Sequence, residues 1–234
     1  MSPTRQQVLM YHSVDDFDED PYLITVRPAR FAAQMAWLRG RGLRGVSMRE
    51  LLRAQREGTA RRLVGLTFDD GYADFAAHAL PVLLRQGFTA TVFAVTGRLG
   101  GDNAWDPLGP RKPLMTAEQL RQVADEGMEV ASHTQTHLSL AGAPTGDLYH
   151  EVKTSRTDLE AILGHEVLGL AYPYGHADRE AVEAVRAAGY TYACGIKPGE
   201  ADQLCLPRTH VSDDDRRLRL TVKRGLHYWK WGRR

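Results

Sequence analysis

Short apolar runs alternate with amphipathic stretches along most of the chain. Val8–Tyr11 and Leu63–Phe68 are apolar runs of strand length, and residues 89–95 are both apolar and β-branched, as in buried strands. Residues 28–41 instead place apolar side chains at helical spacing. By the same criteria we expect strands at 43–46, 128–132, 167–172 and 190–194, and helices at 48–56, 75–86, 116–126, 147–163 and 179–188.

The order of these elements predicts the fold class. Strands and helices alternate, nearly always with a helix after a strand, which is typical of an α/β fold whose parallel sheet closes into a barrel. The chain has 234 residues and no linker, repeat or low-complexity tract. We therefore expect one domain over residues 1–234, with its chemistry at the carboxyl ends of the strands.

Three local signals refine this picture. Ser47, followed three residues later by Glu50, predicts a capping box at the start of the next helix. Pro81 should kink the helix at 75–86 or mark a turn within it. Residues 97–113 contain four Gly and three Pro, and so long a loop in a compact domain is more often functional than idle.

Composition narrows the class of protein. Hydrophobic residues make up 43% and charged residues 25% of the chain, and the formal net charge is +1. This balance is typical of a globular protein and does not favour nucleic acid as a partner. Cys194 and Cys205 form either one disulfide or two free thiols, and we favour free thiols. Because no signal-peptide pattern and no apolar span of about 20 residues is present, we expect a cytoplasmic location.

Carboxylates and imidazoles follow two of the predicted strands. Asp69 and Asp70 come directly after Phe68, and His133 and His137 come after the strand at 128–132. One carboxylate and two imidazoles form a ligand set for a divalent cation that keeps positions open for water and substrate. We expect Asp70, His133 and His137 to bind one such ion, with both histidines projecting from one helical turn. Zinc is the default, and nickel, cobalt or iron would also fit.

Asp69 is the candidate general base. A carboxylate beside a divalent cation stays ionised and can accept a proton from bound water. The simpler alternatives are that Asp69 only caps the Asp-Gly turn and that His133 and His137 are surface histidines. His12 and Tyr174 also follow predicted strands closely, which places them at the same end of the barrel.

Several motifs resemble those of one enzyme family. Thr-Phe-Asp-Asp-Gly at 67–71 and Ser-His-Thr-Gln-Thr-His at 132–137 look like the first two signature motifs of the polysaccharide deacetylases, the NodB-homology group or carbohydrate esterase family 4. Further similar segments lie at 10–12, 151–155, 171–175, 188–190 and 206–208. The resemblance implies a distorted (β/α)7 barrel, TIM-like and of the NodB-homology type. It also implies removal of acetyl groups from N-acetylated sugars with one divalent metal ion.

The resemblance also implies roles for single residues. Asp69 is the base, and Asp70, His133 and His137 hold the metal. The backbone N–H of Tyr174 helps form the oxyanion hole, since Pro173 before it has no N–H to donate.

Two departures from the family pattern matter. Most members carry an Arg that orients the base where this chain has Ala171. We expect Arg208 to orient the base instead. The alternative is that Arg208 only forms an ion pair at the surface. The usual C-terminal Leu-x-His that supplies the general acid is also missing. Residues 10–14 instead resemble the subgroup that deacetylates poly-β-1,6-N-acetylglucosamine, whose acid follows the first strand. We therefore expect His12 to protonate the leaving amine, with His210 as the second candidate.

The long loop and the C-terminal tail complete the candidates. Residues 100–106 resemble the same subgroup, so we expect Trp105 to stack on a sugar ring and Asn103 to bind hydroxyls, beside Tyr174. The alternative is a Trp that only plugs the barrel rim. Residues 223–234 are basic and aromatic. Weak contact with an anionic membrane surface is one interpretation, and we favour a docked last turn with solvated charges.

These residues predict a metal-dependent N-deacetylase that hydrolyses the acetamide of an N-acetylhexosamine in a glycan or glycoconjugate and releases acetate. One rival is an amidohydrolase of the same fold that acts on a small cyclic amide, and the intact ligand set counts against it. The other is a non-catalytic sugar-binding protein, which only the loss of the Arg at 171 supports. The particular sugar and the oligomeric state stay open.

Overall fold

The computed structural model describes residues 6–196 and 203–231, and parallel strands form its centre. The strands are β1 Val8–Tyr11, β2 Ser13–Val14, β3 Thr25–Val26, β4 Arg44–Val46, β5 Leu63–Phe68, β6 Thr91–Ala94, β7 Glu129–Ser132, β8 Gly169–Ala171, β9 Tyr192–Gly195, β10 Leu206–Pro207 and β11 Thr209–His210. One nine-stranded sheet has the order β10-β9-β8-β7-β6-β5-β1-β11, with β4 beside β5, while β2 and β3 pair separately.

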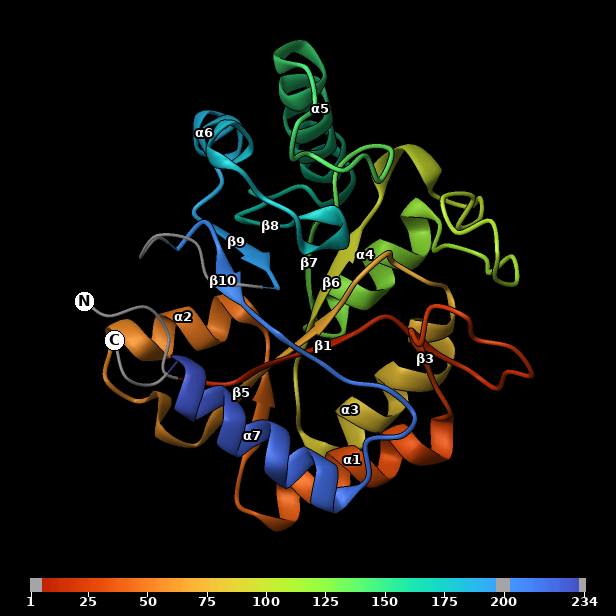
Figure 1. Ribbon diagram of the computed structural model, residues 1–234, viewed down its shortest axis with the longest axis vertical. Helices are drawn as coiled ribbons and strands as arrows, with labels where there is room; N and C mark the ends of the chain where they lie inside the picture. The colour runs from red at the N-terminus through yellow and green to blue at the C-terminus, as the bar shows by residue number, and fades with distance from the viewer. Residues whose placement is uncertain (1–5, 197–202, 232–234) are drawn as a thin grey trace.

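Helices surround this sheet (Figure 1). They are α1 Pro28–Gly40, α2 Met48–Arg56, α3 Leu80–Gln86, α4 Ala117–Asp125, α5 Thr145–Leu163, α6 Arg179–Ala187 and α7 Arg217–Trp231. Short helical turns are η1 Ala60–Arg62, η2 Phe75–Ala79, η3 Thr96–Arg98 and η4 Pro173–Gly175. The near-closed barrel of parallel strands confirms the predicted α/β fold. No described helix is both long and apolar enough to cross a bilayer.

The two edges of the sheet are neighbours in the sequence. β10 and β11 lie at opposite ends of the strand order, yet only Arg208 separates them in the chain. The backbone therefore crosses from one edge to the other at Arg208, whose side chain is buried. Our prediction ended with the strand at 190–194 and missed this crossing, because two-residue strands are too short to show a period.

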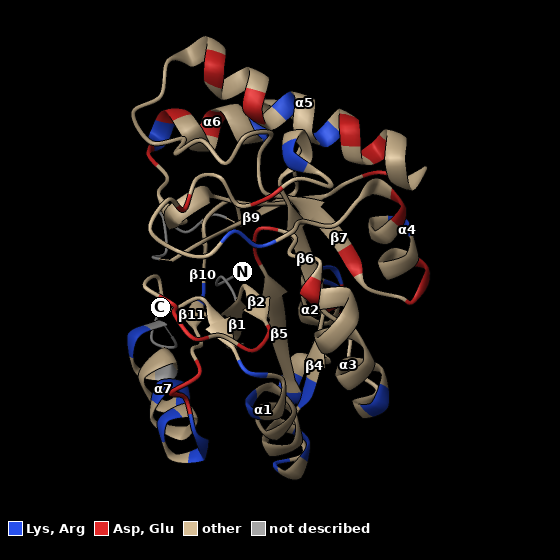
Figure 2. Ribbon diagram, turned by 90° about the vertical axis from the view of Figure 1, so that its right-hand side faces the viewer, with Lys and Arg blue, Asp and Glu red and all other residues tan. Residues whose placement is uncertain are grey.

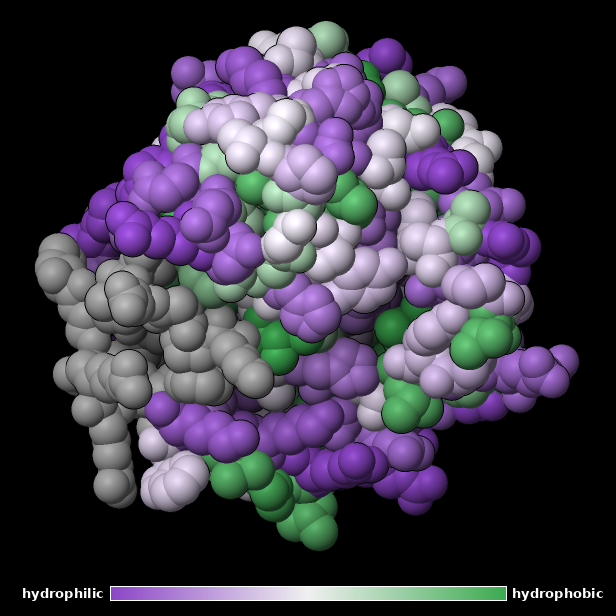
Figure 3. Space-filling view, turned by 45° about the horizontal axis from the view of Figure 1, so that its top comes forward, coloured by the Kyte–Doolittle hydropathy of each residue, from purple (hydrophilic) through white to green (hydrophobic). Residues whose placement is uncertain are grey.

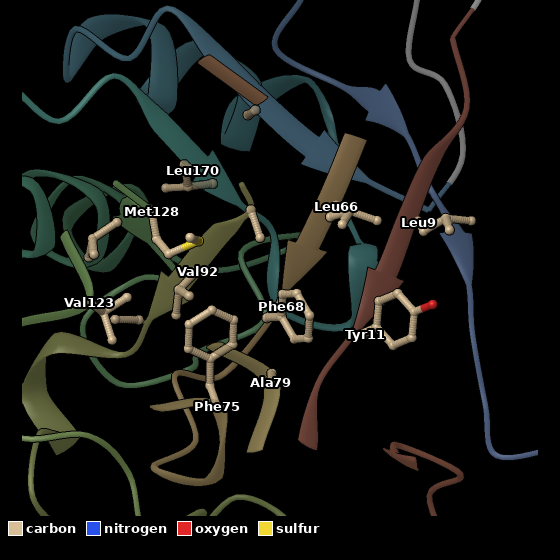
Figure 4. Close-up of a cluster of buried hydrophobic side chains, with 14 of the residues drawn as sticks. Leu9, Tyr11, Leu66, Phe68, Phe75, Ala79, Val92, Val123, Met128 and Leu170 are labelled. Atoms are coloured by element: carbon tan, nitrogen blue, oxygen red, sulfur yellow. The ribbon is translucent and has the colours of Figure 1, made fainter. Parts of the chain in front are cut away.

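Side-chain alternation along the strands separates an outer core from the barrel interior. In β5, Leu66 and Phe68 point outward into the core beneath the helices, where Phe68 stacks on Tyr11 with ring centroids 5.2 Å apart (Figure 4). Thr67 has the opposite orientation, and its hydroxyl donates to the Leu9 carbonyl. Asp69 continues the inner series, so the strand itself aims this carboxylate into the barrel.

Local capping follows the prediction in part. Ser47 accepts a hydrogen bond from the Glu50 N–H at the start of α2. The Glu50 carboxylate, however, accepts hydrogen bonds from Arg44 and from the Thr89 hydroxyl. The Thr89 hydroxyl in turn accepts a hydrogen bond from the Ser47 N–H. The predicted capping box is therefore wrong, because the Ser47 N–H and the Glu50 carboxylate bind other partners instead of each other. Pro81 lies in the first turn of α3, directly after the η2 turn.

Cys194 and Cys205 are both buried and form no disulfide in the described part of the chain, which confirms the predicted thiols. The face of the molecule drawn in Figure 3 is mainly hydrophilic, with hydrophobic side chains in small groups.

Candidate active site

Four parallel strands deliver the candidate residues to one place. His12 follows β1, Asp69 and Asp70 follow β5, and His133 follows β7. Tyr174 lies in the η4 turn after β8. All of them line a pocket of about 290 Å³. The other lining residues are Met10, Tyr22, Ile24, Trp105, Asp106, His137, Gly175 and Ile196.

Asp70, His133 and His137 form a buried cluster that fits a divalent metal ion. Asp70 Oδ1 lies 3.3 Å from the Nε2 atom of each histidine. Two ligands held at about 2.1 Å by a tetrahedral zinc ion lie roughly 3.4 Å apart, so the spacing suits such an ion. Burial raises the pKa of Asp70, but hydrogen bonds from both imidazoles outweigh this and hold its pKa well below the usual range. The carboxylate is therefore ionised, as a metal ligand must be.

The backbone of this cluster corrects one prediction. His133 and His137 do not lie on a helical turn, because residues 133–137 form a loop. Four of the five non-glycine residues with left-handed backbone in the described chain belong to the site: Asp70 (φ 72°), Thr134 (φ 67°), His137 (φ 69°) and Tyr174 (φ 58°). Such backbone costs about 1–3 kcal/mol per residue and persists only where surrounding contacts impose it.

Helix α5 supplies contacts that hold the histidine loop. Glu151 Oε2 accepts the backbone N–H groups of Gln135 and Thr136, each at 2.8 Å. Four residues along the helix, Ser155 Oγ lies 2.7 Å from Ser132 Oγ at the end of β7. These bonds give a physical role to the Glu and Ser at 151 and 155, whose part sequence reasoning left unassigned.

The two histidines are oriented by different means. His133 Nδ1 lies 2.8 Å from the Ala171 carbonyl oxygen, an arrangement that leaves Nε2 free to face Asp70. His137 Nδ1 has no hydrogen-bond partner among the described residues. Its ring instead stacks on Trp105, with centroids 4.4 Å and planes 14° apart. Trp105 thus lines the pocket and packs against His137, a candidate metal-binding residue. Its contact with a sugar stays a prediction.

Arg208 and Asp69 form a bidentate ion pair. Arg208 Nη1 donates to Asp69 Oδ1 at 2.5 Å, and Nη2 donates to Oδ2 at 2.8 Å. Both residues are buried, which rules out a surface ion pair. Burial raises the pKa of Asp69, but the charges of Arg208, His133 and His12 and the Arg208 hydrogen bond outweigh it, and the pKa is lowered. The carboxylate is thus ionised and fixed in orientation.

His12 is closer to this chemistry than His210. His12 Nε2 lies 3.9 Å from Asp69 Oδ2, and its side chain lines the pocket. The His210 ring lies 6.0 Å from the His12 ring and is not part of the lining. Burial and the charges of His12 and Lys223 lower the pKa of His210 to about 4. A neutral imidazole is a poor general acid, so the lowered pKa of His210 favours His12 for this role.

Asn103 is buried, its Oδ1 accepts the Lys112 N–H at 2.8 Å, and its Nδ2 donates to the Pro110 carbonyl. Both ends of the amide thus hold the loop, and the contact of Asn103 with sugar hydroxyls stays a prediction. One further prediction needs correction: the C-terminal tail is more than a last turn, because α7 runs for 15 residues to Trp231. Residues 232–234 lie outside the described chain.

The pocket contains an acid that sequence reasoning missed. Asp106 lines it beside Trp105. Burial and the charge of Asp70 raise the pKa of Asp106 to about 6. Its place directly after the candidate Trp was the signal available in the sequence.

Comparisons with known proteins agree with this geometry. The sequence profile of the polysaccharide deacetylase family matches residues 56–193. The chain is 29% identical over 203 residues to the Bacillus subtilis (strain 168) protein YxkH, covering 86% of this chain and 68% of that one. It is 29% identical over 245 residues to the poly-beta-1,6-N-acetyl-D-glucosamine N-deacetylase of Escherichia coli (strain K12), covering 88% of this chain but 36% of that protein. The structure of the Streptococcus pyogenes deacetylase PplD in complex with acetate aligns with a TM-score of 0.79 at 25% identity, covering 95% of this chain and 99% of that one.

Proposed function

Because the chain belongs to the polysaccharide deacetylase family, whose members are hydrolases that act on acetamide bonds, we propose that it removes acetyl groups from N-acetylglucosamine units of a glycan. The observation that carries this proposal is the convergence on one pocket of the Asp70–His133–His137 cluster, the Asp69–Arg208 pair and His12. The name of the Escherichia coli relative suggests the substrate class, a β-1,6-linked N-acetylglucosamine polymer.

Asp70, His133 and His137 would hold one divalent ion, which we propose is zinc because tetrahedral Asp/His ligation with an open position suits it. Bound there, the ion would polarise the acetamide carbonyl and lower the pKa of a water molecule.

The remaining groups move protons and hold the substrate. Asp69 accepts the proton of the attacking water. Arg208 holds the two carboxylate oxygens of Asp69 in place by hydrogen bonds. The Tyr174 N–H, at the pocket wall, donates to the carbonyl oxygen as it becomes negative. His12 gives a proton to the amide nitrogen as the C–N bond breaks. Acetate then carries the water oxygen, and the sugar keeps a free amine.

Acetate release from short β-1,6-linked N-acetylglucosamine oligomers tests the proposal. The metal-loaded chain should release acetate, a chelator should stop the reaction, and added zinc should restore it. Asp69→Asn should keep its metal but lose turnover by about 10²–10⁴-fold, because an amide cannot accept the proton. Asp18→Asn, which changes an exposed carboxylate, is the matched control and should behave like wild type.

Three outcomes would contradict parts of this proposal. Acetate release that does not depend on metal would remove the proposed cofactor. Oligomer binding by the metal-loaded chain without any acetate release would favour the sugar-binding rival, and turnover of a small cyclic amide instead of the oligomers would favour the other rival.

A further inference from the structure

Helix α7 has two opposite faces. Leu220 and His227 are buried against the rest of the molecule. At about 100° per residue, the positions 218, 222, 226 and 229 fall on the other side of the helix. The apolar side chains there are exposed: Leu218 by 78%, Val222 by 52%, Leu226 by 47% and Trp229 by 63%. We call these four residues the apolar stripe. Figure 3 shows hydrophobic side chains along the lower edge of the molecule, over the part where Figure 1 places α7.

Most charges beside the apolar stripe are positive, and the exceptions are Asp214 and Asp215, which precede α7 and form ion pairs with Arg219 and Lys223. Neither α7 nor α1 contains an Asp or Glu, whereas α4, α5 and α6 carry both signs of charge (Figure 2). On the helical projection, cations of α7 flank the stripe on both sides. The cations of the two helices are Arg30, Arg39, Arg217, Arg219, Lys223, Arg224 and Lys230.

A basic hollow adjoins the stripe at the start of α7. This cavity of about 280 Å³ lies between α1 and α7, and its lining includes Arg30, Gln34, Arg216, Arg217 and Leu218. Arg216 and Arg217 are exposed there, and their guanidinium groups can donate to phosphate oxygens.

We propose that α7 and α1 together bind the surface of an anionic phospholipid bilayer. The apolar stripe enters the boundary between headgroups and acyl chains, and the flanking cations contact the phosphates, as in helices that lie in the plane of a membrane interface. A second copy of this chain fits poorly, because its cations would meet like charges. A soluble polyanion would use the cations but leave the stripe exposed. The surface shares no residue with the pocket, so the proposal stands apart from the proposed deacetylase function.

Vesicle cosedimentation of the full chain tests this surface. The chain should sediment with vesicles of phosphatidylcholine that contain about one quarter phosphatidylglycerol, and much less with phosphatidylcholine alone. Salt at about 0.5 M should weaken the binding, since it shortens the screening length to a few ångströms. Each cation near such a bilayer strengthens binding by roughly fivefold, so R217E/K230E should weaken it by about 25-fold or more. L218S/L226S should weaken it by about tenfold, because two apolar side chains no longer enter the interface.

Matched control variants lie on α5, across the sheet from α7 (Figure 2). Tyr149→Ser removes a side chain that is 46% exposed, and Lys153→Glu reverses an exposed charge. Both should bind like wild type, and every variant should keep the wild-type circular dichroism spectrum and melting temperature. All side chains changed in these variants are exposed, so folding should be unaffected.

Four results would overturn the proposal. They are equal sedimentation with both vesicle types, equal losses in the α5 controls, and wild-type binding by L218S/L226S. The fourth is a wild-type dimer in solution that L218S/L226S converts to a monomer, which would make this face an interface between copies.

Discussion

Arg208 reaches Asp69 from 139 positions further along the chain. It does so because the backbone crosses between the two sheet edges at this residue, which places its guanidinium inside the barrel beside the end of β5. The family position that usually carries the orienting Arg holds Ala171 here, and Ala171 uses its carbonyl oxygen to orient His133. An arginine thus holds the orientation of Asp69 here as well, but it comes from a different part of the sheet.

This pair predicts a difference between two substitutions. Arg208→Lys keeps the positive charge but cannot form the two-pronged bond, so kcat should fall by about 10²-fold with normal metal content. Arg208→Gln also removes the charge that lowers the pKa of Asp69. The acidic limb of its pH–rate profile should therefore move to higher pH, while that of Arg208→Lys moves little. Wild-type kcat in Arg208→Lys would show that the orientation of Asp69 does not matter.

Stability must be measured beside these rates. Removing one partner of a buried ion pair typically costs about 3–5 kcal/mol, so Arg208→Gln should melt at a lower temperature than wild type. Assays are therefore run well below its melting temperature.

His12 predicts a dependence on the leaving group. His12→Ala should bind metal normally and lose amide hydrolysis by about 10²–10⁴-fold, because the amine cannot depart without a proton. An activated aryl acetate should be cleaved nearly as fast as by wild type, since its leaving group needs no proton. His210→Ala should be mild in both assays. A harmless His12→Ala beside a crippling His210→Ala would instead assign the acid to the C-terminal strand.

Among the helices, α7 carries a buried histidine that makes stability depend on pH. His227 lies on its buried side, where burial lowers the pKa from 6.5 to about 4. The unfolded chain therefore binds a proton between these values that the folded chain rejects. This contribution to stability is complete above about pH 6.5 and is lost as the pH falls toward 4.

Urea unfolding at a series of pH values tests this element. The free energy of unfolding of wild type should fall between about pH 6.5 and 4. His227→Gln cannot take up that proton, so its free energy should fall less steeply, and Thr221→Ser on the exposed side of α7 should follow wild type. Parallel curves for wild type and His227→Gln would show that His227 does not set the slope.

At the scale of the whole molecule, the site draws on strands from β1 to the β10–β11 crossing, so no half of the chain holds it complete. We propose that residues 1–234 form a single domain. Unfolding should then give one transition, with the same midpoint by circular dichroism and by tryptophan fluorescence. Added zinc should raise that midpoint, because an ion that binds only the folded chain stabilises it. Two separate transitions would contradict a single domain.

Local pattern was enough to locate the strand ends and the acids and imidazoles that follow them. Periodicity and spacing act over a few residues, so the positions of Asp69, Asp70, His133 and His12 could be predicted from neighbours in the chain. The same holds for the helices, whose predicted bounds differ from the structure by a few residues at most, apart from α7.

Contacts between distant segments decided the rest. The left-handed loop at His137 depends on α5 and Trp105. The chain crossing at Arg208 requires both edges of the sheet to be formed. The exposed stripe of α7 is set by the burial of Leu220 on the opposite side of the helix. None of these features has a local period, because each is determined by which distant groups compete for a backbone or side-chain partner when the barrel closes.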